Sequence, residues 1–159
     1  MRKPRLYLET SVWNFYFADD APDKKDITKE FFGCVKQDRY NIFISQTVLN
    51  EIDRADEHKK NQLLGLIKEY RPQELDVNQE VTDLAKEYIS QKILPETKVE
   101  DALHAATSAV YEMDALLSWN NRHLANLFKM EKINGINLMK GYTKHLEIIT
   151  PMEVITDED

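Results

Sequence analysis

Residues 99–126 read V-E-D-A-L-H-A-A-T-S-A-V-Y-E-M-D-A-L-L-S-W-N-N-R-H-L-A-N, and this stretch decides the fold. Asp101 opens a run in which small and apolar residues recur at helical spacing, so we expect a helix over 99–113. A short apolar run at 115–117 follows as a strand. The polar cluster at 118–120 stands where that strand ends, and strand ends of this kind are where parallel α/β sheets build their sites.

Two further acids occupy equivalent places. Glu9 lies in Y-L-E-T-S after an expected strand at 5–8, and Glu51 lies in L-N-E-I on a helix after an expected strand at 40–44. Taken singly, each acid is also consistent with an ordinary surface carboxylate, and Asp101 with a plain helix N-terminal acid. Together, Glu9, Glu51 and Asp101 favour a site of several carboxylates around a metal ion.

The alternation of strands and helices along the chain predicts a three-layer α/β/α domain with a central, mostly parallel sheet of four or five strands. We expect one domain over 1–159, with a short acidic tail at 156–159. The expected strands are 5–8, 40–44, 74–77, 115–117 and 146–150. The expected helices are 27–37, 47–54, 56–70, 79–91, 99–113 and 122–133, with a helix or turn at 12–17, a polar loop at 19–26, a turn at 134–135 and a further candidate helix at 136–140.

Composition narrows the class of protein. The chain is 42% hydrophobic and 31% charged, as in ordinary soluble domains, and it contains no apolar run near the roughly 20 residues that span a bilayer. Its first residues do not resemble a signal peptide, so we expect a cytoplasmic protein. The single Cys34 excludes an internal disulfide. The net charge of −7 argues against non-specific wrapping of nucleic acid but leaves room for a nuclease with a local binding surface.

Four motifs in order carry a specific resemblance: Y-L-E-T-S, S-Q-T-V-L-N-E-I, V-E-D-A-L-H-A-A and L-L-S-W-N-N-R-H-L. In order and spacing they resemble a PIN-domain protein over nearly the whole chain. PIN domains are metal-dependent ribonucleases, and many are toxins of toxin–antitoxin pairs. The resemblance therefore implies an RNA substrate, a small antitoxin that inserts into an acidic groove, and a homodimer.

Carried over residue by residue, the resemblance places Glu9, Glu51, Asp101 and Asn120 at the catalytic and metal-binding positions, with Ser11 orienting the first acid. The family usually has Asp where this chain has Glu9 and Asn120. Mg²⁺ or Mn²⁺ suits such oxygen ligands and would activate water to cut RNA. The resemblance implies products that end in a 5′-phosphate and a 3′-hydroxyl. With only three formal negative charges at the four positions, we expect one tightly bound cation rather than two.

Other polar and aromatic residues nearby carry less specific signals. Arg122 and His123 follow Asn120 at the start of an expected helix, where they could contact phosphate as well as be ordinary surface charges. Lys98 is a weaker candidate for the same role. His104 we expect to be packed or to support another residue, and we leave it out of the metal site. The aromatic residues at 13–17 could stack bases of single-stranded RNA. Such a run just after a first strand is more often core or oligomer packing, so we favour packing, with room for one exposed ring.

Two alternatives to a nuclease stay open. The first is a catalytically attenuated PIN-like module that binds RNA or protein, because Glu9 and Asn120 both depart from the usual acids. The second is a structural module whose groove binds an antitoxin-like partner. Metal titration and Asp101→Asn separate these classes.

Overall fold

The computed structural model describes residues 2–155, and the expected acidic tail lies outside the described residues. Five parallel strands form one sheet in the order β3-β2-β1-β4-β5. The strands are β1 (Arg5–Leu8), β2 (Asn41–Ser45), β3 (Gln73–Leu75), β4 (Ala115–Leu117) and β5 (Glu147–Ile149). The predicted parallel sheet is therefore confirmed.

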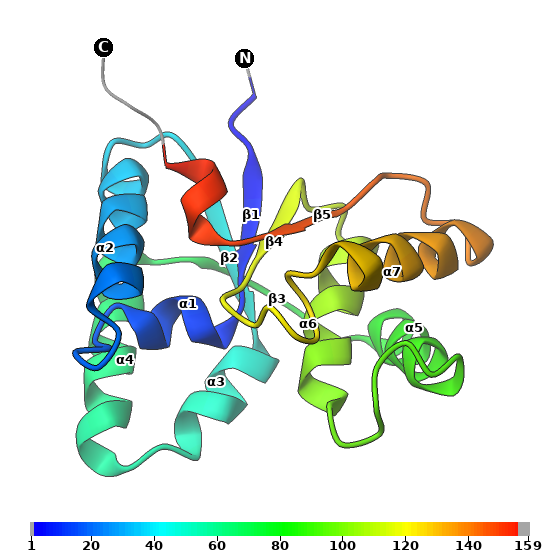
Figure 1. The fold of residues 1–159 in the computed structure, drawn as a ribbon, viewed down its shortest axis with the longest axis horizontal. Helices are drawn as coiled ribbons and strands as arrows, with labels where there is room; N and C mark the ends of the chain where they lie inside the picture. Colours follow the sequence, from blue (N-terminus) through cyan, green and yellow to red (C-terminus); the bar gives the residue numbers. More distant parts are fainter. Residues whose placement is uncertain (1, 156–159) are drawn as a thin grey trace.

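Helices flank this sheet on both faces. They are α1 (Thr10–Phe15), α2 (Pro22–Lys36), α3 (Gln46–Asp53), α4 (Glu57–Tyr70), α5 (Gln79–Ser90), α6 (Val99–Val110) and α7 (Leu127–Met139), with a final 3₁₀ turn, η1 (Pro151–Val154). Helices α1, α2 and α4 lie on one side of the sheet, and α5, α6 and α7 on the other (Figure 1). Within residues 2–155, none of the helices has both the length and the apolar character needed to cross a bilayer.

The central strand is β1, whose Leu6, Tyr7 and Leu8 are buried. The chain first builds outward from β1 through β2 to β3, and then returns to add β4 and β5 on the other side. The strand order thus reverses between β1 and β4, which pair in parallel with Leu8 opposite Leu117. Ligands of open α/β sheets bind outside the carboxyl ends of the strands at such a reversal. Glu9 and Ser118 are the next residues of the two strands.

The predicted bounds of α2 and α7 differ most from the structure. Helix α2 begins at Pro22, inside the predicted polar loop, because proline suits the first turn of a helix, where its missing N–H is not needed. Helix α7 begins at Leu127, rather than at 122, after a turn. It then continues through the predicted turn at Asn134 and Gly135 to Met139, in keeping with the further candidate helix at 136–140.

Tertiary hydrogen bonds explain the course of α7. Asn126 caps the helix by accepting hydrogen bonds from the backbone N–H groups of Phe128 and Lys129. Asn134 donates to the carbonyl of Leu146 at 2.9 Å and accepts from its N–H at 2.8 Å. Asn134 therefore holds the segment leading into β5 from within a helix, instead of forming a turn.

Candidate metal and nucleic-acid site

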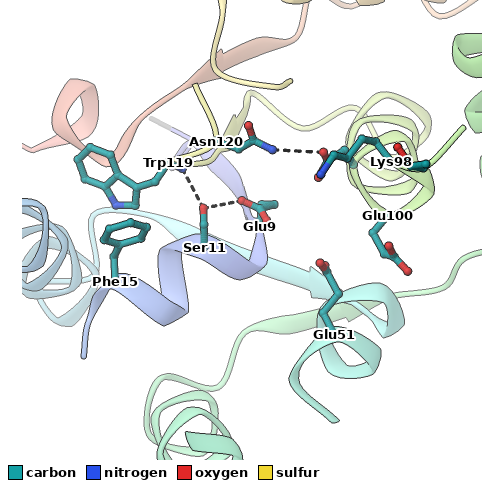
Figure 2. A pocket seen from close by; sticks show the side chains of 10 residues that line it. Glu9, Ser11, Phe15, Glu51, Lys98, Glu100, Trp119 and Asn120 are labelled. Atoms are coloured by element: carbon teal, nitrogen blue, oxygen red, sulfur yellow. Dashed lines mark hydrogen bonds between the residues drawn. The ribbon is translucent and has the colours of Figure 1, made fainter. Parts of the chain in front are cut away.

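Three carboxylates lie near the carboxyl ends of the central strands. Glu9 follows β1, Glu51 lies on α3 just after β2, and Asp101 lies in the first turn of α6. All three line one open pocket of about 320 Å³. Its lining residues are Glu9, Ser11, Phe15, Glu51, Thr97, Lys98, Glu100, Asp101, Trp119 and Asn120. Figure 2 shows Glu9 near the middle of the pocket, with Glu51 and Glu100 on neighbouring elements.

Glu9 is held by two serine hydroxyls. Ser11 donates to its Oε1 atom at 2.5 Å and Ser118 donates to the same atom at 2.7 Å. Each hydroxyl also accepts a backbone N–H, from Trp119 to Ser11 at 2.8 Å and from Asn120 to Ser118 at 2.9 Å. The ends of β1 and β4 are thereby joined around a carboxylate that is only 5% exposed. Ser11 lies where the sequence placed it, whereas Ser118 was not predicted to take part.

Glu51 is held by Thr10 and by a fully buried histidine. Thr10 Oγ1 donates to Glu51 Oε1 at 2.7 Å, and Nε2 of His104 lies 2.5 Å from the same oxygen. On its other side, His104 Nδ1 lies 2.7 Å from the hydroxyl of Tyr7. Burial raises the pKa of Glu51, but the hydrogen bond and charge of His104 outweigh it and leave this pKa below its usual value. Glu51 is therefore ionised and accepts from the Nε2–H group.

His104 belongs to the site more closely than its sequence context indicated. Glu9, Glu51 and His104 each offer a ligand atom, and these atoms lie within 4.8 Å of one another. Burial lowers the pKa of His104, but the hydrogen bond to Glu51 and the charges of Glu9 and Asp101 raise it overall. The expectation of a supporting role agrees with its contact to Glu51. Its place one helical turn after Asp101 was the signal that could have assigned it to this face.

Asp101 lies where its negative charge is disfavoured. It is 8% exposed, and burial together with the negative charge of Glu9 raises its pKa to about 6. Its Oδ2 atom accepts a hydrogen bond from the Nδ2 amide of Asn120 at 3.2 Å, drawn as a dashed line in Figure 2. A cation bound here would relieve the repulsion among the carboxylates, which is the environment that a divalent metal site requires.

Asn120 presents its amide nitrogen, not its oxygen, to Asp101. The Oδ1 atom accepts from the backbone N–H groups of Arg122 at 3.2 Å and His123 at 3.0 Å. These two acceptor bonds fix the orientation of the amide. The side chains of Arg122 and His123 do not line the pocket, and they lie in a turn rather than at a helix start.

The pocket has two different flanks. Lys98 and Glu100 lie on one flank, and Glu100 accepts from Arg54 of the chain just after α3 at 3.1 Å. Phe15 and Trp119 lie on the other (Figure 2). Within the run at 13–17, Trp13 is buried against Phe32, with ring centroids 5.2 Å apart, whereas Phe15 is partly exposed. The run therefore packs, with Phe15 as its ring at the site.

Comparison with known proteins gives a likeness of structure. No protein-family model matches the chain, and no curated protein matches it in sequence. One similar structure is that of VapBC2 from Rickettsia felis bound to a DNA fragment from the VapBC2 promoter. A chain of it aligns with a TM-score of 0.56 and 20% identity, over 91% of this chain and 98% of that one.

VapC20 from Mycobacterium tuberculosis, a sarcin–ricin loop cleaving toxin, aligns with a TM-score of 0.59 and 14% identity, over 87% of this chain and 97% of that one. At such identities the likeness concerns the fold. The chain therefore has the PIN-domain fold seen in these structures, as its four motifs predict.

Proposed function

We propose that this protein is an endoribonuclease of PIN type that hydrolyses RNA with the help of Mg²⁺ or Mn²⁺. The observation that carries the proposal is the convergence of Glu9, Glu51 and Asp101 on one pocket at the reversal of strand order. When bound, a divalent cation polarises a phosphodiester and makes water nucleophilic near neutral pH. The open pocket admits a phosphate of an RNA strand beside the carboxylates.

The chain's own residues divide the work of holding such a cation. Glu9, Glu51 and Asp101 supply the oxygen ligands that Mg²⁺ and Mn²⁺ prefer. Asn120 completes the site by holding Asp101 through its amide, while its own oxygen accepts backbone N–H groups. His104 and Thr10 fix Glu51, and Ser11 and Ser118 fix Glu9. Because the four positions carried over from the resemblance hold three carboxylates and one amide, we propose one tightly bound cation.

The same resemblance leads us to propose a partner and a cellular setting. We propose that the protein is the toxin of a toxin–antitoxin pair in the cytoplasm, and that it forms a homodimer. A small antitoxin would insert a segment into the acidic pocket and shield it from RNA. The likeness to VapC20, which is a toxin, and to a chain of VapBC2 supports this proposal.

The decisive experiment combines metal titration with RNA cleavage. Wild-type protein is expected to bind Mn²⁺ and to cut RNA only when a divalent ion is present, and Asp101→Asn should lose both properties. Asp23→Asn is the matched control, because Asp23 is an exposed acid in the first turn of α2. Products ending in 5′-phosphate and 3′-hydroxyl would exclude a contaminating ribonuclease that leaves a cyclic phosphate. Cleavage that persists in Asp101→Asn would contradict the proposal.

One observation favours a second candidate, an attenuated module that binds RNA or protein. Asn120 stands where a fourth acid is usual, and its amide donates to Asp101 instead of presenting an oxygen to the pocket. Such a module would keep its RNA affinity when divalent ions are removed and would cut no RNA. The metal dependence of RNA binding therefore separates the two candidates.

A further inference from the structure

One flank of the pocket is built from aromatic rings and a lysine. The rings of Phe15 and Trp119 lie with centroids 5.8 Å apart, tilted by 48°. The Nζ atom of Lys24, on α2, lies 5.4 Å from the Phe15 centroid and 5.5 Å from that of Trp119. We call these three residues the aromatic flank.

Hydrogen bonds hold Trp119 of the aromatic flank in place, and one of their partners also holds Glu9. The Trp119 indole N–H donates to Thr28 Oγ1 at 3.0 Å, and its backbone N–H donates to Ser11 Oγ. The same Ser11 hydroxyl donates to Glu9. Ser11 therefore holds both the Glu9 carboxylate and the backbone of Trp119, while Thr28 holds the indole ring.

Of the two rings of this flank, Phe15 is the more exposed. Both rings line the pocket, but Phe15 is partly exposed whereas Trp119 is only 9% exposed. In residues 2–155, Lys24 forms no ion pair with a carboxylate, unlike its neighbour Lys25, which pairs with Asp19. Among the described residues, the charge of Lys24 is therefore neutralised by no carboxylate, and it lies over the two rings.

We propose that the aromatic flank is a stacking subsite for an unpaired nucleobase adjacent to the phosphate that is cut. The inference rests on the proposed ribonuclease function. Aromatic rings beside a cation bind single-stranded nucleic acid, because every base offers a face for stacking and every linkage a negative charge. Lys98 lies on the opposite flank of the pocket (Figure 2). In this proposal it contacts the phosphate on the other side of the carboxylates. The strand then crosses the pocket from Phe15, over the carboxylates, to Lys98.

This path selects unpaired RNA. A base within a duplex is already stacked on its neighbours and cannot also lie on Phe15 without leaving its pair. We expect a strand annealed to its complement to be cut more slowly than the same strand alone. A variant lacking the Phe15 ring should lose most of this preference.

The test changes the RNA and the protein in turn. A short unstructured RNA with a mapped cut is synthesised with one abasic ribose at each position. At one position beside the cut, the abasic residue should raise KM of the wild-type protein about 5- to 100-fold, the range expected for a lost stacking contact. In Phe15→Leu, KM for the intact RNA should rise by a similar factor, and the abasic residue should then cost little more. Phe15→Tyr should restore wild-type behaviour.

Phe128→Leu is the matched control, because Phe128 is 71% exposed and lies on α7 outside the pocket. Melting temperatures of both variants check that Phe15→Leu folds, and the abasic RNA tests the subsite without changing the protein. If Phe15→Leu responds to every abasic residue as the wild type does, the subsite is refuted while the nuclease proposal stands. If the wild type cuts no RNA with Mn²⁺, both proposals are refuted.

Discussion

In the pair formed by buried His104 and partly exposed Glu51, Nε2 of the imidazole lies 2.5 Å from Oε1 of the carboxylate. The imidazole has no exposed surface, and its other nitrogen meets the Tyr7 hydroxyl of the central strand. Glu51 is thus anchored to the middle of the sheet through His104. In metal sites, partners that orient a ligand in this way contribute strongly to affinity.

Replacing His104 should weaken metal binding while the protein still folds. We expect His104→Gln to lower Mn²⁺ affinity by roughly 10- to 100-fold, because Glu51 keeps only the hydrogen bond from Thr10. Calorimetric titration with Mn²⁺ measures the change, alongside a thermal melt. His58→Gln, at an exposed histidine of α4, is the control and should bind Mn²⁺ like the wild type. Unchanged affinity in His104→Gln would show that Glu51 does not depend on this contact.

The raised pKa of Asp101 predicts a pH dependence of metal binding. A cation requires this carboxylate in its ionised form, and the pKa is about 6 in the metal-free protein. Mn²⁺ affinity should therefore be constant above about pH 7 and fall by roughly tenfold per pH unit below 6. Titrations between pH 5 and 8 in non-coordinating buffers would measure it, and a midpoint near pH 4 would contradict the assignment.

The raised pKa of Asp101 also determines whether replacing this residue stabilises or destabilises the protein. Because folding raises the pKa of Asp101, its contribution to stability is fully present below about pH 4 and is lost as pH rises through 6. Without metal at pH 7.5, Asp101→Asn should therefore be more stable than the wild type, by at most about 3 kcal/mol. With saturating Mn²⁺ the order should reverse, because the wild type binds the ion and the variant does not. Denaturant unfolding with EDTA and with Mn²⁺ tests both signs.

Asn120→Asp should make the protein more dependent on metal. The change replaces an amide that donates to Asp101 by a carboxylate that repels it, while the new oxygens can still accept the backbone N–H groups of Arg122 and His123. We expect a lower melting temperature in EDTA and a roughly tenfold gain in Mn²⁺ affinity. Asn121→Asp, at the exposed neighbouring position, adds the same charge outside the pocket and serves as control. A gain in RNA cleavage would show that the native site is attenuated.

Asn134→Ala should affect the fold and leave the site unchanged. The substitution leaves the backbone N–H and carbonyl of Leu146 without their partner, which costs about 1 to 3 kcal/mol in a buried setting. The melting temperature should fall by several degrees while Mn²⁺ affinity stays at the wild-type value. An unchanged melting temperature would mean that α7 continues past Asn134 for other reasons.

The sequence indicated those parts of the structure that depend on local periodicity and on strand ends. Glu9, Glu51 and Asp101 could be assigned to one edge because Glu9 follows a strand, Glu51 lies on the helix after a strand and Asp101 opens a helix, and parallel topology brings such positions together. The path of α7 could not be predicted in this way, since Asn134 favours a turn locally and is kept helical by its bonds to Leu146. The contact of His104 with Glu51 could not be predicted, because helical spacing indicates that a side chain is buried but not which polar group it meets.

The two serines that share Oε1 of Glu9 bear on how this position can change. Aspartate is one methylene shorter, so its carboxylate would retract from hydroxyls that are themselves tethered to the backbone of residues 119 and 120. Side-chain length at position 9 and the spacing of its two hydroxyl donors are therefore interdependent. Replacing Glu9 by aspartate therefore requires a compensating shift of the end of β4. Without that shift, the hydroxyls of Ser11 and Ser118 would lose their acceptor.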